Sequence, residues 1–366
     1  MRILLLVLTC ATLEAQRAYV WNLPKGFPTP RVPADNPMTA AKVELGRHLF
    51  YDNRMSVNGG SSCATCHKQE LAFTDGKAVS TGTTGEPHPR GAMSLVNIAY
   101  NAVLTWSNPG MKELERQALL PMFGEHPIEL GLREGDGFLE TLRSDPKYRE
   151  LFERAFPEPG ERFTNANVTR ALASFERSII SARSPWDRYH YGGDDGAVSD
   201  AAKRGEVLFF NQHLSCFRCH GGFNFSGATL SEGHPVRDPD FHNTGLYNVP
   251  GGLGYPAPNL GIFEFTRDPK DAGKFKAPTL RNIALTAPYM HDGSIATLEE
   301  VLEHYAAGGR TLRSGPYAGI GHDNTNKDPL IGGFKLSGQE RSDLVEFLKS
   351  LTDEEVLHDR RFANPW

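Results

Sequence analysis

The chain has 366 residues, a length that predicts two domains or one large one. Hydrophobic residues make up 39% of it, and its 37 Gly and 25 Pro indicate many loops, as expected when large apolar cofactors replace part of the side-chain core. The net charge of −5 and the lack of a basic run argue against nucleic acid as a partner.

Residues 1–18, approximately, have the pattern of a secretory signal peptide. Arg2 gives a minimal charged region, Ile3–Cys10 form a short apolar run, and Leu13–Ala15 offer a cleavage site. The apolar run is too short to cross a bilayer, so we expect no membrane span. Cys10 is the only cysteine outside two short motifs described below. Removing this segment would therefore leave no cysteine pair for a disulfide.

A helix is expected early in the mature chain, because Thr39 is a candidate cap and apolar residues follow at helical spacing. They are Ala41, Val43, Leu45, Leu49 and Phe50. This helix leads to the first motif, Cys63-Ala64-Thr65-Cys66-His67. Further helices are expected over residues 114–120, 137–156 and 167–181. These elements define a first domain over residues 38–191.

Gly192–Gly196 is the best linker in the chain. Ser199 then opens a helix that leads to the second motif, Cys216-Phe217-Arg218-Cys219-His220, 153 residues after the first. Closing helices are expected over residues 298–306 and 338–351. They complete a second domain over residues 197–351, and residues 352–366 form a C-terminal tail.

Each motif has the spacing C-x-x-C-H, in which two thiols bond covalently to the vinyl groups of a haem and the histidine binds iron. Four of the five cysteines belong to these motifs. We therefore expect two covalently bound haem c groups, held by Cys63, Cys66, Cys216 and Cys219, with His67 and His220 as iron ligands. The repeat of a helix followed by C-x-x-C-H predicts an all-α fold of two cytochrome c-like haem domains with long irregular loops. Haem c is attached outside the cytoplasm, which together with the signal peptide predicts a periplasmic protein.

The residues around these motifs resemble bacterial di-haem cytochrome c peroxidases and MauG over roughly residues 38–350. The first domain carries Asn97, Trp106, Leu114-Glu115-Arg116-Gln117, Pro121 and Pro127-Ile128-Glu129-Leu130-Gly131. The second carries Ala277-Pro278-Thr279-Leu280-Arg281-Asn282 and Leu285-Thr286-Ala287-Pro288-Tyr289-Met290-His291-Asp292-Gly293. The motifs occur in the family's order and at nearly its spacing.

The resemblance implies that Tyr305 is the sixth ligand of the second haem, fourteen residues after His291. Peroxidases of the family carry Met at this position, and MauG carries Tyr. An anionic tyrosinate would stabilise oxidised iron and lower the potential of that haem. His304 and Met290 are rival ligands, and adjacent helical residues point in different directions, so only one of His304 and Tyr305 can reach iron.

For the first haem, the resemblance implies that Glu129 is the distal acid–base group. It also implies that Gln117 and Pro121 line the same distal pocket. Members that need reductive activation carry a distal His where Thr83 lies here. His88 is five residues out of that register and is expected to be an exposed loop residue, leaving the first haem open to peroxide. His126 is a second candidate proton donor.

Trp106 matches a tryptophan that lies between the two haems in the family. The family also binds calcium there, through carbonyls matching Thr286 and Pro288 and through an Asn side chain. Gly91 stands at the Asn position and offers no side-chain oxygen, so calcium remains a possible cofactor.

Loops around Pro121–Pro127 and Pro87–Gly91 are similar to a MauG-related subgroup that includes MbnH, a di-haem enzyme with a small copper-binding partner. The resemblance implies an enzyme that uses H₂O₂ to reach a high-valent state shared by two haems and oxidises aromatic residues, Trp foremost, of a partner protein. The first alternative is a cytochrome c peroxidase that reduces H₂O₂ with electrons from a small redox protein. The second is an electron-transfer cytochrome with both haems six-coordinate, against which Glu129 argues.

Overall fold

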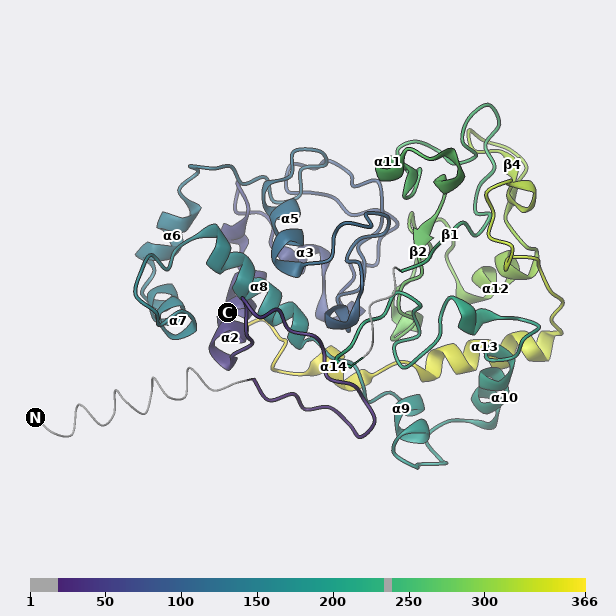
Figure 1. The fold of residues 1–366 in the computed structure, drawn as a ribbon, viewed down its shortest axis with the longest axis horizontal. Coiled ribbons are helices and arrows are strands. Elements are labelled where there is room, and N and C mark those ends of the chain that lie inside the picture. The colour runs from purple at the N-terminus through teal and green to yellow at the C-terminus, as the bar shows by residue number, and fades with distance from the viewer. Residues whose placement is uncertain (1–18, 234–238) are drawn as a thin grey trace, which may run out of the picture.

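The computed structural model describes residues 19–233 and 239–366, so the expected signal peptide at residues 1–18 lies outside the described part of the chain. The helices gather in two groups, one built from the first half of the chain and one from the second half (Figure 1). The C-terminal segment crosses back to the first group. Within the described residues, no helix is both long and apolar enough to span a membrane.

The first group of helices surrounds the first C-x-x-C-H motif. Its α-helices are α2 (Ala40–Tyr51), α3 (Cys63–Cys66), α4 (Leu114–Gln117), α5 (Leu119–Phe123), α6 (Phe138–Ser144), α7 (Pro146–Ala155) and α8 (Asn165–Ser178). Thr39 caps α2 by accepting a hydrogen bond from Lys42 N, as its sequence position predicts. The helix expected over residues 137–156 is two helices, because Asp145 caps α7 and Pro146 begins it.

The second group surrounds the second motif. Its α-helices are α9 (Pro185–His190), α10 (Asp200–Phe209), α11 (Phe263–Thr266), α12 (Leu298–Ala306) and α13 (Gly338–Ser350). The last helix, α14 (Glu354–His358), lies in the C-terminal segment that returns to the first group. Two antiparallel pairs of two-residue strands occur in its loops, β1 (Phe241–His242) with β2 (Phe275–Lys276) and β3 (Thr311–Leu312) with β4 (Gly319–Ile320). Helices dominate the regular structure, as expected, but the fold is not purely α-helical. Strands this short leave no alternating pattern in a sequence.

In each group, two helices cross at a glycine where no side chain fits. A Cβ at Gly46 of α2 would lie 1.9 Å from Ala171 O of α8. A Cβ at Gly205 of α10 would lie 2.0 Å from Asp343 O of α13. Four residues after Ala171 and Asp343 come Phe175 and Phe347. The Cβ of each Phe would also be in close contact with the Cβ added at the glycine. This repeated crossing supports an internal duplication of one helical unit.

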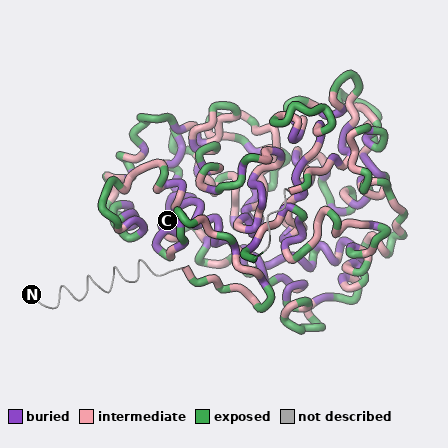
Figure 2. The backbone as a smooth tube through the Cα atoms, viewed as in Figure 1, coloured by how far each residue is buried: buried purple, intermediate pink, exposed green. Residues whose placement is uncertain are grey.

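The buried side chains form two main clusters, which follow the two groups of helices. Figure 2 shows buried stretches of the chain in both groups. The first is centred on Phe50, Phe73 and Phe175, and the second on Phe225 and Phe347. Helix α14 in the C-terminal tail contributes Val356 to the first cluster, although the tail follows the second group in sequence. The predicted domain boundaries at residues 191 and 197 remain predictions.

Candidate functional site: two C-x-x-C-H histidines in unequal surroundings

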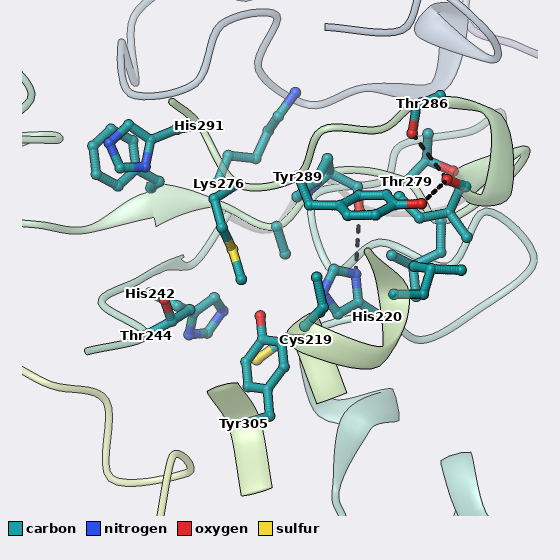
Figure 3. Close-up of a pocket in the computed structure, with 18 of the residues that line it drawn as sticks. Cys219, His220, His242, Thr244, Lys276, Thr279, Thr286, Tyr289, His291 and Tyr305 are labelled. Atoms are coloured by element: carbon teal, nitrogen blue, oxygen red, sulfur yellow. Dashed lines mark hydrogen bonds between the residues drawn. The ribbon is translucent and has the colours of Figure 1, made fainter. Parts of the chain in front are cut away.

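The histidines of the two motifs are held in the same way. His67 Nδ1 lies 2.9 Å from the carbonyl oxygen of Phe73. His220 Nδ1 lies 3.3 Å from the carbonyl oxygen of Phe225 and 3.1 Å from that of Pro278 (Figure 3). A backbone acceptor for Nδ1 fixes the ring and leaves Nε2 available to bind a metal, which is a common arrangement for metal-binding histidines.

Burial shifts the pKa values of the titratable groups in both motifs. Burial lowers the pKa of His220 to about 4 and also lowers that of His67, so both imidazoles are neutral, as iron ligands must be. Burial raises the pKa of Cys216 to about 11 and that of Cys219 to about 12, so these thiols are not ionised at neutral pH. Two thiols and one neutral imidazole at C-x-x-C-H spacing fit a haem at each motif.

A cavity of about 250 Å³ lies beside the second motif. Its walls are mainly apolar and include Cys216, Cys219 and His220. Tyr305 from α12 also lines it, and Figure 3 shows the phenol oxygen pointing into the space in front of His220. The cavity therefore has the lining and the donor atoms that a haem with two protein ligands requires.

The three candidate sixth ligands occupy different places. Tyr305 and Met290 both line the cavity, whereas His304 is not among its lining residues. His304 is buried and packs its ring edge-on against Tyr305, with centroids 5.0 Å apart. Burial raises the pKa of the Tyr305 phenol, with smaller contributions from Cys219 and Cys216, so its ionised form needs a cation nearby. Iron would supply that cation, and Tyr305 as ligand remains a prediction with Met290 as its rival.

The first motif packs against the apolar core through Cys63 and Ala64, but carboxylates also act on it. Glu129 is 39% exposed, and its carboxylate acts electrostatically on Cys63, Cys66 and His67 of the motif. Burial, then Asp75 and then Glu129, raises the pKa of Cys66 to about 11. The predicted acid–base group thus lies close enough to the first motif to influence its charges.

The loop that carries Thr83, at the position where some family members have a distal His, packs directly against the Glu129 segment. Thr83 N donates to Glu129 O at 2.7 Å, and a Cβ at Gly82 would lie 1.7 Å from Ile128 O. The same loop brings His88 Nε2 to 3.6 Å from Glu129 Oε1. His88 is 30% exposed rather than free in solvent, so the expectation of an exposed loop residue is wrong for this side chain. Counting sequence positions against the family could not predict this contact, because His88 and Glu129 lie in two different loops.

The other residues predicted for the first site differ in burial and in their contacts. Pro121 in α5 accepts a hydrogen bond from Leu130 N at 2.9 Å, which fixes the residue after Glu129. Gln117 is half-buried at the end of α4, one helical turn before Pro121. His126 is exposed, so its predicted role as a distal proton donor has no burial to support it.

Trp106 joins the two halves of the molecule. It lines the cavity, and its Nε1 donates to Gly91 O at 3.0 Å. Its carbonyl accepts from Lys276 N of β2 at 2.9 Å. Sequence reasoning did not select Lys276, which lines the same cavity, is 2% exposed and has its pKa lowered to about 7 by burial. An isolated Lys gives no sequence signal of this kind.

The predicted calcium carbonyls also belong to this cavity. Thr286 and Pro288 line it together with Gly91. Across residues 19–233 and 239–366, no three His, Cys, Asp or Glu side chains gather in a way that could hold a metal ion. A calcium site here would rest on carbonyls and water, and it remains a prediction.

The carbonyls that orient the histidines were also missed by sequence reasoning. Phe73 and Phe225 both adopt a left-handed backbone, with φ of 59° and 48°, which turns each chain back toward its motif. A signal was present: a Phe follows each motif histidine by six or five residues. Ser94–Asn97 and Thr279–Asn282 repeat as well, and Asn97 and Asn282 have φ of 58° and 59°. Two copies of one haem-binding unit with unequal surroundings are typical of di-haem peroxidases rather than of simple electron carriers.

Comparison with known proteins agrees with this class. The family model for di-haem cytochrome c peroxidase matches residues 40–195. Cytochrome-c peroxidase IdrP1 of Denitromonas iodatirespirans is 36% identical over 91% of this chain and 87% of its own length. Methylamine utilization protein MauG of Methylophilus methylotrophus is 32% identical over 94% of both chains. The chain therefore belongs to the di-haem cytochrome c peroxidase family, whose members are peroxidase-type oxidoreductases with haem c.

Two solved structures extend the comparison. A MauG-like protein associated with microbial copper homeostasis is 47% identical, with a TM-score of 0.93 over 95% of this chain and all of that one. The di-haem peroxidase BthA from Burkholderia thailandensis is 18% identical, with a TM-score of 0.67 over 93% of this chain and 94% of that one, and supports the fold alone.

Proposed function

We propose that this protein is a MauG-like enzyme that uses H₂O₂ to oxidise aromatic residues, Trp foremost, of a partner protein. The observation that carries the proposal is the position of Tyr305, which lines the cavity beside His220 while His304 does not. Similarity to both the MauG of M. methylotrophus and the MauG-like protein of copper homeostasis supports it. We further propose that residues 1–18 direct the protein to the periplasm, where haem c is attached.

The two haems would supply the redox chemistry, storing the two oxidising equivalents of H₂O₂. The protein supplies orientation and proton transfer. His67 and His220 would be the iron ligands, and backbone carbonyls that accept from Nδ1 fix the orientation of both rings. Glu129 takes a proton from incoming peroxide and returns it to the leaving oxygen, which becomes water. His88, 3.6 Å from Glu129, helps to hold the carboxylate in place.

Tyr305 and Trp106 make the second haem site suited to storing oxidising equivalents rather than to accepting electrons from a donor. A phenolate oxygen from Tyr305 favours oxidised iron. Trp106 lies on the wall of the same cavity and is bonded to both halves, through Gly91 O and Lys276 N. Its indole is therefore placed to carry electrons between the two haem sites.

The second candidate function is reduction of H₂O₂ to water with electrons from a small redox protein. Met290 favours it, because this thioether also lines the cavity beside His220. The relatives include cytochrome-c peroxidases as well as MauG. A Met-bound second haem would accept electrons from a donor more readily than a Tyr-bound one.

The proposal is tested on the ferric holoenzyme by electron paramagnetic resonance (EPR). We expect one high-spin signal from an open haem at His67 and one low-spin signal from the haem at His220. Two low-spin signals would contradict the proposal. Small secreted proteins encoded beside the gene are then treated with enzyme and H₂O₂ and mapped by mass spectrometry. Oxidised Trp in one of them is the expected result, whereas rapid oxidation of a reduced small cytochrome c without Trp oxidation would favour the second function.

A further inference from the structure

A buried tryptophan packs against Phe225, one of the two residues whose carbonyl oxygens lie next to Nδ1 of the second motif histidine. Trp186 of α9 is 4% exposed, and its ring packs edge-on against Phe225 with centroids 4.8 Å apart. Phe225 is also the residue whose carbonyl oxygen lies 3.3 Å from His220 Nδ1. A continuous series of contacts thus connects the second haem site to Trp186.

The indole of Trp186 has a proton acceptor. Its Nε1–H donates to Glu206 Oε1 of α10 at 2.7 Å, a short bond to a charged oxygen. An indole that loses an electron becomes a strong N–H acid, so a carboxylate at this distance takes the proton and stabilises the neutral radical. The neighbouring carboxylate of Asp187 is neutralised by Arg281, so Glu206 is the group set to accept the proton.

Trp186 also contacts a residue at the surface. Its ring is stacked on the imidazole of His190, with centroids 4.5 Å apart and an interplanar angle of 11°. His190 is exposed at the end of α9. A buried, oxidisable ring thus contacts the interior of the second half on one side and an exposed aromatic ring on the other.

We infer that Trp186 is a redox relay that carries oxidising equivalents from the haem held by His220 to an electron donor at the surface around His190. The inference rests on the proposed function. Trp186 gives one electron to that haem and its Nε1 proton to Glu206. An aromatic donor outside then gives one electron to the Trp186 radical, and the proton returns from Glu206. Two such rounds supply the two electrons that, with two protons, convert one H₂O₂ to two water molecules.

The chain has four tryptophans, so a radical can be assigned by replacing them one at a time. Trp106 lines the internal cavity, whereas Trp366 is 54% exposed and packs against His48, a residue of the first group of helices. A radical pathway through Trp186 therefore predicts a large effect of Trp186→Phe and none of Trp366→Phe.

The first experiment treats the holoenzyme with H₂O₂ alone and freeze-quenches it for high-field EPR. Wild-type enzyme is expected to show a neutral indole radical whose hyperfine pattern narrows when Trp is deuterated. Trp186→Phe should lose this signal, and Trp366→Phe should keep it. Peptide mapping after longer exposure should find added oxygen on Trp186. A radical that persists in Trp186→Phe, or an absence of any indole radical in wild-type enzyme, overturns the inference.

A second variant guards against misfolding of Trp186→Phe. Glu206→Gln keeps a side-chain oxygen for the Nε1 hydrogen bond but removes the proton acceptor, so radical formation should slow by about 10². An unchanged rate would remove Glu206 from the pathway and contradict the relay as stated. Failure of the proposed function looks different, because wild-type enzyme would then leave every candidate partner unoxidised. Oxidation of the partner at the wild-type rate by Trp186→Phe would contradict the relay and leave the proposed function intact.

Discussion

His88 Nε2 lies 3.6 Å from Oε1 of Glu129, although 41 residues separate the two in sequence. The contact exists because the loop before Arg90 packs against the Glu129 segment, through Thr83 N to Glu129 O and through the close approach of Gly82 to Ile128 O. A carboxylate and an imidazole from two different loops therefore lie next to each other. Of the two, Glu129 acts on the motif residues His67, Cys63 and Cys66.

Glu129→Gln is expected to slow the reaction with H₂O₂ by about 10² or more, because an amide cannot take and return a proton. Stopped-flow absorbance in the Soret region measures the rate. His126→Gln is the matched control, since His126 is exposed, and it should react at the wild-type rate. Wild-type kinetics in Glu129→Gln would remove Glu129 from the mechanism.

Tyr305→Phe is expected to change the low-spin EPR signal of the resting enzyme and to abolish any near-infrared band that forms with H₂O₂. The physical reason is the loss of an anionic oxygen ligand that stabilises oxidised iron. Met290→Leu tests the rival ligand and should leave both features unchanged. The reverse pattern, an unaltered spectrum in Tyr305→Phe and a changed one in Met290→Leu, would favour the cytochrome c peroxidase function.

Local sequence signals predicted several of the capped helices, whereas the capped helices α9 and α14 were not predicted. Thr39 begins α2, and the helix expected over residues 298–306 matches α12, Leu298–Ala306. The break between α6 and α7 had a visible signal, Asp145 followed by Pro146, which apolar spacing across it obscured. The His88–Glu129 contact had none, because it depends on how two loops pack and not on spacing within either one.

The two haem motifs were recognisable because their chemistry requires residues that are adjacent in sequence. Their surroundings were recognisable only through resemblance to known proteins, as for Tyr305. The Phe73 and Phe225 carbonyls and the Trp186–Glu206 bond are long-range or backbone features. No periodic pattern encodes them, so they required the structure.

Gly46→Ala is expected to destabilise the protein by about 1–3 kcal/mol or more, because the new Cβ would lie 1.9 Å from Ala171 O and force α2 away from α8. The shift would be seen as a lower midpoint of thermal unfolding, followed by circular dichroism of the holoprotein. Gly338→Ala is the control: it is also a helical glycine, but apart from its chain neighbours and the backbone of its own helix, no atom lies within 4 Å of the new methyl group. Equal midpoints for both variants would contradict the close crossing.

Glu176 is a buried carboxyl group of α8, 6% exposed, and it acts electrostatically on Cys63. Burial raises its pKa from 4.5 to about 8, with Arg177 lowering it and Glu115 raising it. The native state therefore keeps this proton up to about pH 8, whereas the unfolded chain releases it near pH 4.5. The protonated carboxyl contributes its full stability below pH 4.5 and loses it as the pH rises to about 8.

Wild-type protein is thus expected to lose up to ~1.4 kcal/mol of unfolding free energy per pH unit between those values through this one group. Glu176→Gln keeps the shape of the side chain but has no proton to lose, so its stability should depend less on pH in that window. Thermal unfolding of the two holoproteins from pH 4.5 to pH 8 measures the difference. Glu153→Gln, at an exposed position of α7, should follow the wild-type curve. Parallel curves for wild type and Glu176→Gln would show that Glu176 is ionised in the folded protein.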